Sequence, residues 1–212
     1  MKILFYPTSL NFRYVCHASK IIGKKNAKIK FGFIHKIKEN HSKLDEENIK
    51  NLKKSKLNYR LFFIKNKLNQ KKIDEKYLKY FERISKINIW KIISSDRVLG
   101  RAYINDIHAY RSNYTKENVN EILINFIDTA KKIEKIFLTF RPNVIYISNG
   151  QSNIETSIMN IFAIKYKVKI IVPEPTRLGN FFFFSPSIYI VNKFLIVLHW
   201  DSFNTKINFV FF

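Results

Sequence analysis

Two short apolar segments on either side of a helical pattern constrain the fold of this chain most. Residues 144–148 (VIYIS) form a continuous apolar run, which is typical of a strand buried on both faces of a parallel sheet. Residues 154–162 then repeat apolar side chains at helical spacing, and residues 168–172 form a second apolar run. A strand, a helix and a strand in this order predict a β-α-β unit with parallel strands.

The first part of the chain repeats this arrangement. Residues 2–6 predict a buried strand, and Thr8 and Ser9 are expected to cap the helix that follows, which we expect to end at Gly23. Residues 27–34 alternate apolar and polar side chains, as a strand does. The predicted fold class is therefore α/β, a Rossmann-like parallel sheet flanked by helices.

The other segments are assigned from the same patterns. We expect strands over residues 60–65 and 89–94. Helices are expected over residues 73–87, from Ser95 toward residue 110, and over residues 115–137. We expect one or two exposed helices or a loop over residues 36–58, and a long loop over residues 173–187. Residues 1–192 are assigned to one domain. Residues 193–212 are an apolar tail, either a terminal strand of the sheet or the place where a second half is missing.

Composition limits the classes of function. The chain has 38 Lys and Arg against 16 Asp and Glu, a net charge of +22, so that a polyanionic partner must be considered. The abundance of Ile, Lys, Asn, Phe and Tyr offers another explanation, because an AT-rich gene raises the lysine content by itself. A single cysteine, Cys16, excludes a disulfide framework, and the five histidines show no metal-ligand spacing. Residues 188–200 are too short for a spanning helix, and we expect a cytoplasmic protein.

Candidate site residues follow the predicted strands. In open α/β sheets, ligands bind outside the carboxyl ends of the strands. Asn149, Gly150 and Gln151 follow one strand, and Glu174 and Arg177 follow the next. An asparagine binds hydroxyls, a glutamate can act as a general base, and an arginine grips phosphate or carboxylate. An ordinary turn and a surface ion pair are the alternative interpretations of these residues.

The first strand-to-helix turn is the second candidate place. Arg13 lies there as a possible anion-binding residue, with a solvated charge as the alternative. At the other turn, Ser152 and Glu155 have the spacing of a capping box, and we expect Glu155 to serve as a cap. Cys16 and His17 are neighbours on a helix and point about 100° apart, which favours one core and one surface side chain over a catalytic pair.

Residues 144–187 (VIYISNGQSNIETSIMNIFAIKYKVKIIVPEPTRLGNFFFFSPS) resemble the glycosyltransferases of bacterial capsule and surface-polysaccharide biosynthesis, a group similar to Kdo transferases with the GT-B fold. The strand, Asn149-Gly150, the helix, the second strand and Glu174 match the pattern of that family. Gln151 stands where the family often has arginine, and Pro175-Thr176 replace a glycine-containing turn. Residues 2–21 and, more weakly, residues 94–103 also resemble such an N-terminal domain.

The resemblance implies one Rossmann-like half of a GT-B architecture, the acceptor-side domain, in a metal-independent sugar transferase without a cofactor. It implies Glu174 as the catalytic base and Asn149 and Gly150 as substrate-binding residues. To this set we add Gln151, Arg177 and Arg13, which follow the predicted strands. The implied ligands are a nucleotide-sugar donor and a glycan or lipid-linked acceptor, with a partner chain supplying the second domain. The basic region over residues 20–79 would suit peripheral contact with anionic lipid at the inner face of the plasma membrane.

Two other interpretations stay open. A basic α/β protein can bind nucleic acid, although the chain contains no recognisable nucleic-acid-binding module. The chain can also be a non-catalytic remnant, or a subunit of a split transferase.

Overall fold

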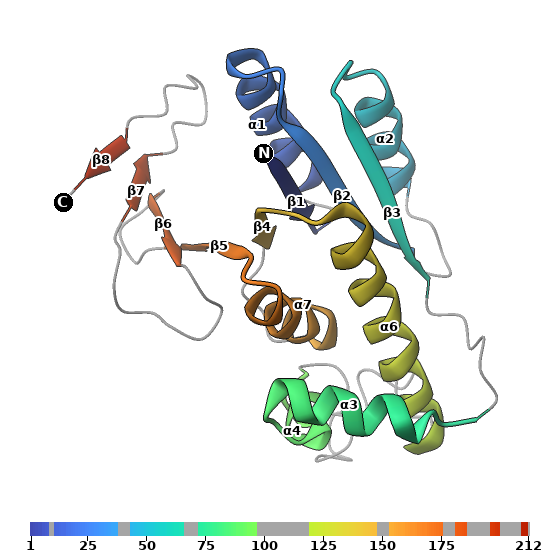
Figure 1. Ribbon diagram of the computed structural model, residues 1–212. Helices are drawn as coiled ribbons and strands as arrows, with labels where there is room; N and C mark the ends of the chain where they lie inside the picture. The colour runs from blue at the N-terminus through green and yellow to red at the C-terminus, as the bar shows by residue number, and fades with distance from the viewer. Residues whose placement is uncertain are drawn as a thin grey trace, which may run out of the picture.

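The chain forms a parallel α/β sheet with helices on both faces (Figure 1). The computed structural model describes residues 1–8, 11–37, 43–65, 72–96, 119–147, 153–175, 181–185, 196–199 and 209–211. The five parallel strands, in spatial order, are β3 (Tyr59–Lys65), β2 (Lys30–Ile37), β1 (Lys2–Tyr6), β4 (Val144–Ile147) and β5 (Lys169–Pro175). This arrangement confirms the predicted Rossmann-like fold class.

Three antiparallel strands continue the sheet beyond β5. They are β6 (Phe181–Ser185), β7 (Ile196–His199) and β8 (Phe209–Phe211). Strands β7 and β8 fall in the segment that we assigned to an apolar tail, residues 193–212. The division of the chain at residue 192 stays a prediction.

Helices complete the parallel crossovers. The described helices are α1 (Phe12–Lys25), α2 (Lys43–Lys53), α3 (Glu75–Ser85), α4 (Ile89–Ser95), α6 (Val119–Phe140) and α7 (Ile154–Lys165). Helices α1 and α2 pack on one face of the sheet, and α6 and α7, with α3 and α4, lie on the other (Figure 1). Among these helices none is both long and apolar enough to cross a membrane.

The sheet separates two apolar cores because successive side chains of a strand point to opposite faces. On β1, Leu4 belongs to the core beneath α6 and α7, whereas Ile3 and Phe5 belong to the core beneath α1 and α2. Gly32 of β2 lies where Phe140 crosses the sheet, and a Cβ at this position would approach the Phe140 ring to 2.9 Å. The glycine therefore allows the end of α6 to sit close to the strand.

Helix α7 is buried on all sides over residues 154–163, since the sheet, α3, α4 and α6 all contact it. Its polar side chains are enclosed as well, and Glu155, Ser157 and Asn160 are each at most 5% exposed. Such a helix has no solvent face, so its polar residues need partners inside the protein.

The structure corrects several local predictions. Residues 89–94 form helix α4 and not a strand, because the Asn88 side chain accepts a hydrogen bond from the Trp90 backbone N–H (2.8 Å) and caps the helix. Helix α1 continues past Gly23 to Lys25. The predicted loop over residues 173–187 is partly a hairpin, in which Glu174 of β5 lies opposite Phe183 of β6. Residues 97–118 lie outside the described residues, so the helix expected after Ser95 stays a prediction.

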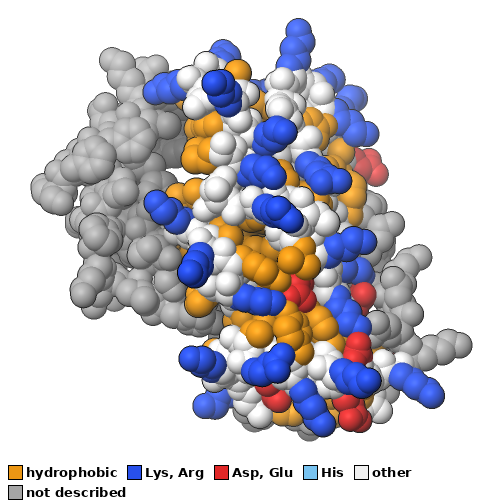
Figure 2. Space-filling model, viewed as in Figure 1, with side chains coloured by type: hydrophobic (Ala, Val, Ile, Leu, Met, Phe, Trp, Pro, Cys, Tyr) orange, Lys and Arg blue, Asp and Glu red, His pale blue; other side chains and the backbone are white. Residues whose placement is uncertain are grey.

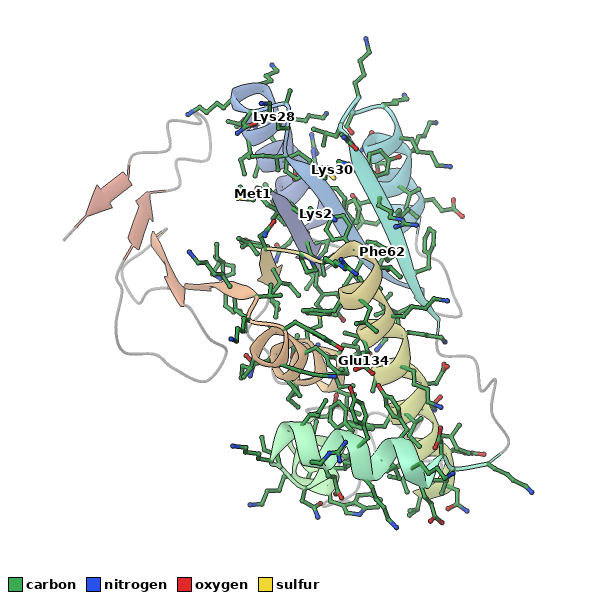
Figure 3. The ribbon with its side chains drawn as sticks, in the orientation of Figure 1. Met1, Lys2, Lys28, Lys30, Phe62 and Glu134 are labelled. Carbon is green, nitrogen blue, oxygen red and sulfur yellow. The ribbon has the colours of Figure 1, made fainter. Side chains whose placement is uncertain are left out.

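A network centred on Glu134 joins three helices (Figure 3). The Glu134 carboxylate of α6 accepts hydrogen bonds from the hydroxyls of Tyr77 (2.9 Å), Tyr80 and Tyr166 (2.9 Å) and from Lys165 Nζ (2.9 Å). The Lys165 ammonium also lies 4.7 Å from the ring centroids of both Tyr80 and Tyr166. Tyr77 and Tyr80 belong to α3 and Lys165 to α7, so the carboxylate ties both helices to α6.

Burial of Tyr146 makes stability sensitive to alkaline pH. Burial raises the pKa of this phenol from 10.0 to about 12, so the folded state favours the neutral ring. A raised pKa gives stability that is present below pH 10 and lost as pH rises toward 12. In the Tyr146→Phe variant, we expect the fall in the free energy of unfolding between pH 9 and pH 11.5 to be smaller by about 1–2 kcal/mol. Urea unfolding at pH 9 and pH 11.5 checks this prediction, with Tyr14→Phe, at an exposed ring, as the control. An unchanged alkaline loss in Tyr146→Phe would contradict it.

Candidate functional site

The topological switch point of the sheet lies between β1 and β4. From β1 the chain crosses through α1 to β2, and from β4 it crosses through α7 to β5 on the other side. The two crossovers leave on opposite faces, and in open α/β sheets the carboxyl ends of two such strands are the place where ligands bind. Tyr6 and Ile147 are paired in register at this edge.

A buried ion pair lies at this edge. Glu155, in the first turn of α7, is 5% exposed and forms an ion pair with Lys36 Nζ, at the end of β2. The Lys36 side chain keeps one third of its surface exposed (34%), whereas the Glu155 side chain keeps 7%. The pair therefore spans the carboxyl end of β1, and part of the Lys36 side chain stays exposed.

A second carboxylate lies at the start of the same helix. Asp96 Oδ2 accepts a hydrogen bond from the Ile154 backbone N–H (2.9 Å), and Asp96 is 6% exposed. Free N–H groups and the helix dipole make the first turn of α7 favourable for negative charge. Asp96 comes from the end of α4, so this contact fixes α4 against α7.

Tyr6 completes the cluster at the end of β1. Its pKa is raised well above 10.0, by burial first and then by the negative charges of Glu155 and Asp96. The phenol is therefore neutral and keeps its proton for donation. We call Tyr6, Lys36, Asp96 and Glu155 the edge cluster. It offers two carboxylates, one ammonium and one hydroxyl within a short segment of the sheet edge.

The structure shows that the predicted role of Glu155 is wrong. The capping box of α7 begins one residue later, where the Asn153 side chain accepts from the Thr156 N–H (2.8 Å) and the Thr156 hydroxyl accepts from the Asn153 N–H (3.2 Å). This one-residue shift turns Glu155 inward toward Lys36. Ser152, the other member of the predicted box, lies outside the described residues.

The remaining predicted site residues are placed only in part. Arg13 lies in the first turn of α1 and is exposed. Strands β4 and β5 are parallel, so the segments after Ile147 and Pro175 leave the same edge of the sheet. Glu174 is in β5, but its side chain lies outside the description. Asn149, Gly150, Gln151 and Arg177 also lie outside the described residues.

The expected helix cap at Thr8 takes another form. The Thr8 hydroxyl accepts from the Asn11 backbone N–H (3.2 Å), and the helix itself begins at Phe12. As predicted, Cys16 is buried and His17 exposed. In the part of the chain that the structure describes, no three His, Cys, Asp or Glu side chains gather as a metal site would require.

Comparison with known proteins adds no family. No model of a protein family matches the chain, and no curated protein matches it. The class of this protein therefore rests on its fold alone, a Rossmann-like α/β fold with five parallel strands.

The Lys36–Glu155 pair gives a testable energetic prediction. Lys36→Met leaves a buried carboxylate without its cation, and we expect the free energy of unfolding to fall by about 2 kcal/mol, since one partner is partly exposed. Adding Glu155→Leu removes the unpaired charge and should restore most of the loss. Urea unfolding of both single variants and of the double variant measures the coupling. Strictly additive losses would show that the two side chains do not interact.

Proposed function

We propose that this chain is the acceptor-side domain of a metal-independent glycosyltransferase of bacterial capsule or surface-polysaccharide biosynthesis. The edge cluster carries the proposal, because it lies at the switch point between the two strand-to-helix turns that hold the candidate substrate-binding residues. Carboxylates accept hydrogen bonds from sugar hydroxyls, and a partly exposed lysine attracts phosphate.

The proposed reaction needs one carboxylate base. The acceptor hydroxyl gives its proton to the carboxylate, its oxygen bonds to the anomeric carbon of the donor, and the bond from that carbon to the phosphate of the nucleotide breaks, so that the nucleotide leaves. We propose Glu174 as this base. Glu155 is held by Lys36 and is proposed to orient acceptor hydroxyls. The proposed substrate-binding residues are Asn149, Gly150, Gln151, Arg177 and Arg13.

A second Rossmann-like domain would complete the enzyme. In the proposed architecture, a partner chain supplies the domain that binds most of the nucleotide-sugar. The acceptor, a glycan or a lipid-linked sugar, binds to the domain described above.

Ligand binding tests the proposal directly. Saturation-transfer NMR of the whole chain with UDP-, GDP- and CMP-sugars and with oligosaccharide acceptors should give signals for at least one compound. Glu155→Gln and Lys36→Met should weaken that binding at least tenfold, whereas Glu47→Gln, at an exposed position of α2, should not change it. Absence of binding across the panel would overturn the proposal and leave a non-catalytic remnant as the better description.

The role of Glu174 has its own test. In an assay that includes the partner domain, Glu174→Gln should lower kcat at least a hundredfold with little change in KM, as expected for a residue that acts on the proton in the transition state. A change in KM alone would assign Glu174 to binding.

A further inference from the structure

The amino edge of the sheet, opposite the edge cluster, is strongly basic. Lys2, Lys30, Arg60 and Lys169 lie at or near the starts of β1, β2, β3 and β5. The turns that lead to the strands add further cations, and the full set, which we call the basic edge, is Lys2, Lys28, Lys30, Lys56, Arg60, Arg141, Lys167 and Lys169. Figure 3 shows Met1, Lys2, Lys28 and Lys30 gathered around the starts of β1 and β2.

Backbone hydrogen bonds fix these residues in a row. Lys2 is paired in register with Lys30, and the Lys30 N–H donates to the Met1 carbonyl (3.0 Å). On the other side of β1, the Lys2 N–H donates to Asn143 Oδ1 (2.8 Å), and the Lys169 N–H donates to the Asn143 carbonyl (3.1 Å). With a strand spacing of about 4.8 Å, the row extends about 20 Å across the sheet.

The charge of the basic edge is not neutralised locally. Residues 23–30, 54–60, 135–143 and 164–169, which build this edge, contain no Asp or Glu. The ion pairs found among the described residues use Lys36, Lys131, Lys132 and Lys165, none of which belongs to the set. Figure 2 shows Lys and Arg side chains over the whole described surface of this view, with few acidic side chains in its upper part.

Helix dipoles explain only part of this charge. Lys24 and Lys25 lie in the last turn of α1, where cations stabilise the helix carbonyls. Arg141, whose Nε donates to the Leu138 carbonyl (3.4 Å), and Lys167 follow the ends of α6 and α7 and gain in the same way. Lys2 precedes the first strand and follows no described helix. An external polyanion is a further explanation for the row of cations along the strand starts.

The details of the edge favour a lipid surface over a nucleic acid. Two aromatic rings near this edge are covered by cations, because Lys2 lies over the Phe140 ring (5.7 Å) and Arg60 over the Phe62 ring (5.6 Å). The edge therefore presents no stacking platform of these rings to bases. Met1 instead exposes 59% of its surface among the lysines, as an apolar group that can enter a bilayer interface.

We infer that the basic edge docks this protein onto the surface of an anionic phospholipid bilayer. This inference goes beyond the proposed function and does not depend on it. The lipid-facing residues are those at the strand starts, not the whole basic region over residues 20–79. The edge cluster then lies about 15 Å farther from the bilayer, at the other end of strands such as β1, and faces the solution.

Vesicle sedimentation tests the inference. The whole chain should bind vesicles of 30% phosphatidylglycerol in phosphatidylcholine, and the binding should weaken steeply between 50 and 300 mM NaCl. The triple variant Lys28→Glu, Lys30→Glu, Lys169→Glu should bind at least fiftyfold more weakly. The matched control changes the same number of exposed lysines on α3 and α4, with Lys76→Glu, Lys79→Glu and Lys91→Glu, and should lose less than threefold.

Each other outcome overturns the inference. Equal losses in the two triple variants would show a response to net charge alone. Equal binding to pure phosphatidylcholine would exclude recognition of anionic headgroups. Tighter binding to a single-stranded RNA than to vesicles at equal phosphate concentration would assign the basic edge to nucleic acid.

Two controls separate lost binding from lost folding. Circular dichroism of the two triple glutamate variants shows whether they fold, and a further triple variant carries glutamine at positions 28, 30 and 169. Sugar binding at the opposite edge is measured independently and should be unchanged in both variants.

Discussion

Phe162→Ala is expected to lower the free energy of unfolding by about 4 kcal/mol, because the change leaves a large cavity in the centre of the larger core. Phe162 is fully buried, and its ring contacts those of Phe81 (centroids 5.8 Å apart), Phe137 (6.1 Å) and Tyr166 (6.2 Å). Phe81 belongs to α3 and Phe137 to α6, and Tyr166 directly follows α7, the helix of Phe162 itself. One side chain therefore holds together the three helices on this face.

Thermal and urea unfolding measure the loss. For a chain of this length, we expect the Tm to fall by about 10 °C. Phe63→Ala removes the same atoms from a ring that is 46% exposed, and should cost no more than about 1 kcal/mol. Similar losses in the two variants would show that α7 is not packed as described.

Glu134→Gln is expected to cost about 3 kcal/mol at pH 7, because it leaves Lys165 without its carboxylate and removes the anion to which three tyrosines donate. Burial opposes the charge on Glu134, but hydrogen bonds from Tyr80, Lys165, Tyr77 and Tyr166 outweigh it and hold the pKa of Glu134 below 4.5. A lowered pKa gives stability that is present above pH 4.5 and lost as the pH falls below it.

The difference between the wild-type chain and Glu134→Gln should therefore shrink as the pH falls from 6 to 3. Urea unfolding at several pH values measures this difference. Glu47→Gln, at an exposed position, should change stability by less than about 0.5 kcal/mol at each pH. A difference that stays constant with pH would show that the charge of Glu134 does not stabilise the fold.

The parallel sheet could be predicted because local runs of apolar residues indicate its strands. Residues 2–6 and 144–147 are apolar runs of strand length, and α6 carries a long helical stripe. Residues 89–94 were assigned to the wrong element because a short apolar run fits a strand or a buried helix equally well. The Asn88 cap, which decides between them, is a weak signal in the sequence.

The edge cluster could be predicted only in part. Glu155 was assigned to a helix cap and not to the site, because the neighbouring Asn153 and Ser152 both suit the N-cap position and the choice between them determines the direction of Glu155. Lys36 and Asp96 are far from it in the sequence, and a long-range pairing leaves no local pattern. The sequence does contain one signal for the burial of Glu155. Apolar side chains lie on nearly every side of α7, which indicates a buried helix, and a buried glutamate needs a partner.

The central claim is that the carboxyl edge between β1 and β4 is the ligand site. Hydrogen–deuterium exchange with and without a saturating nucleotide-sugar or acceptor tests this claim most directly. We expect slower exchange in peptides that cover Tyr6 to Arg13 and the first turn of α7, with no change at the amino edge. Protection confined to other segments, or no protection with any ligand, would contradict the assignment of this edge as a sugar-binding site.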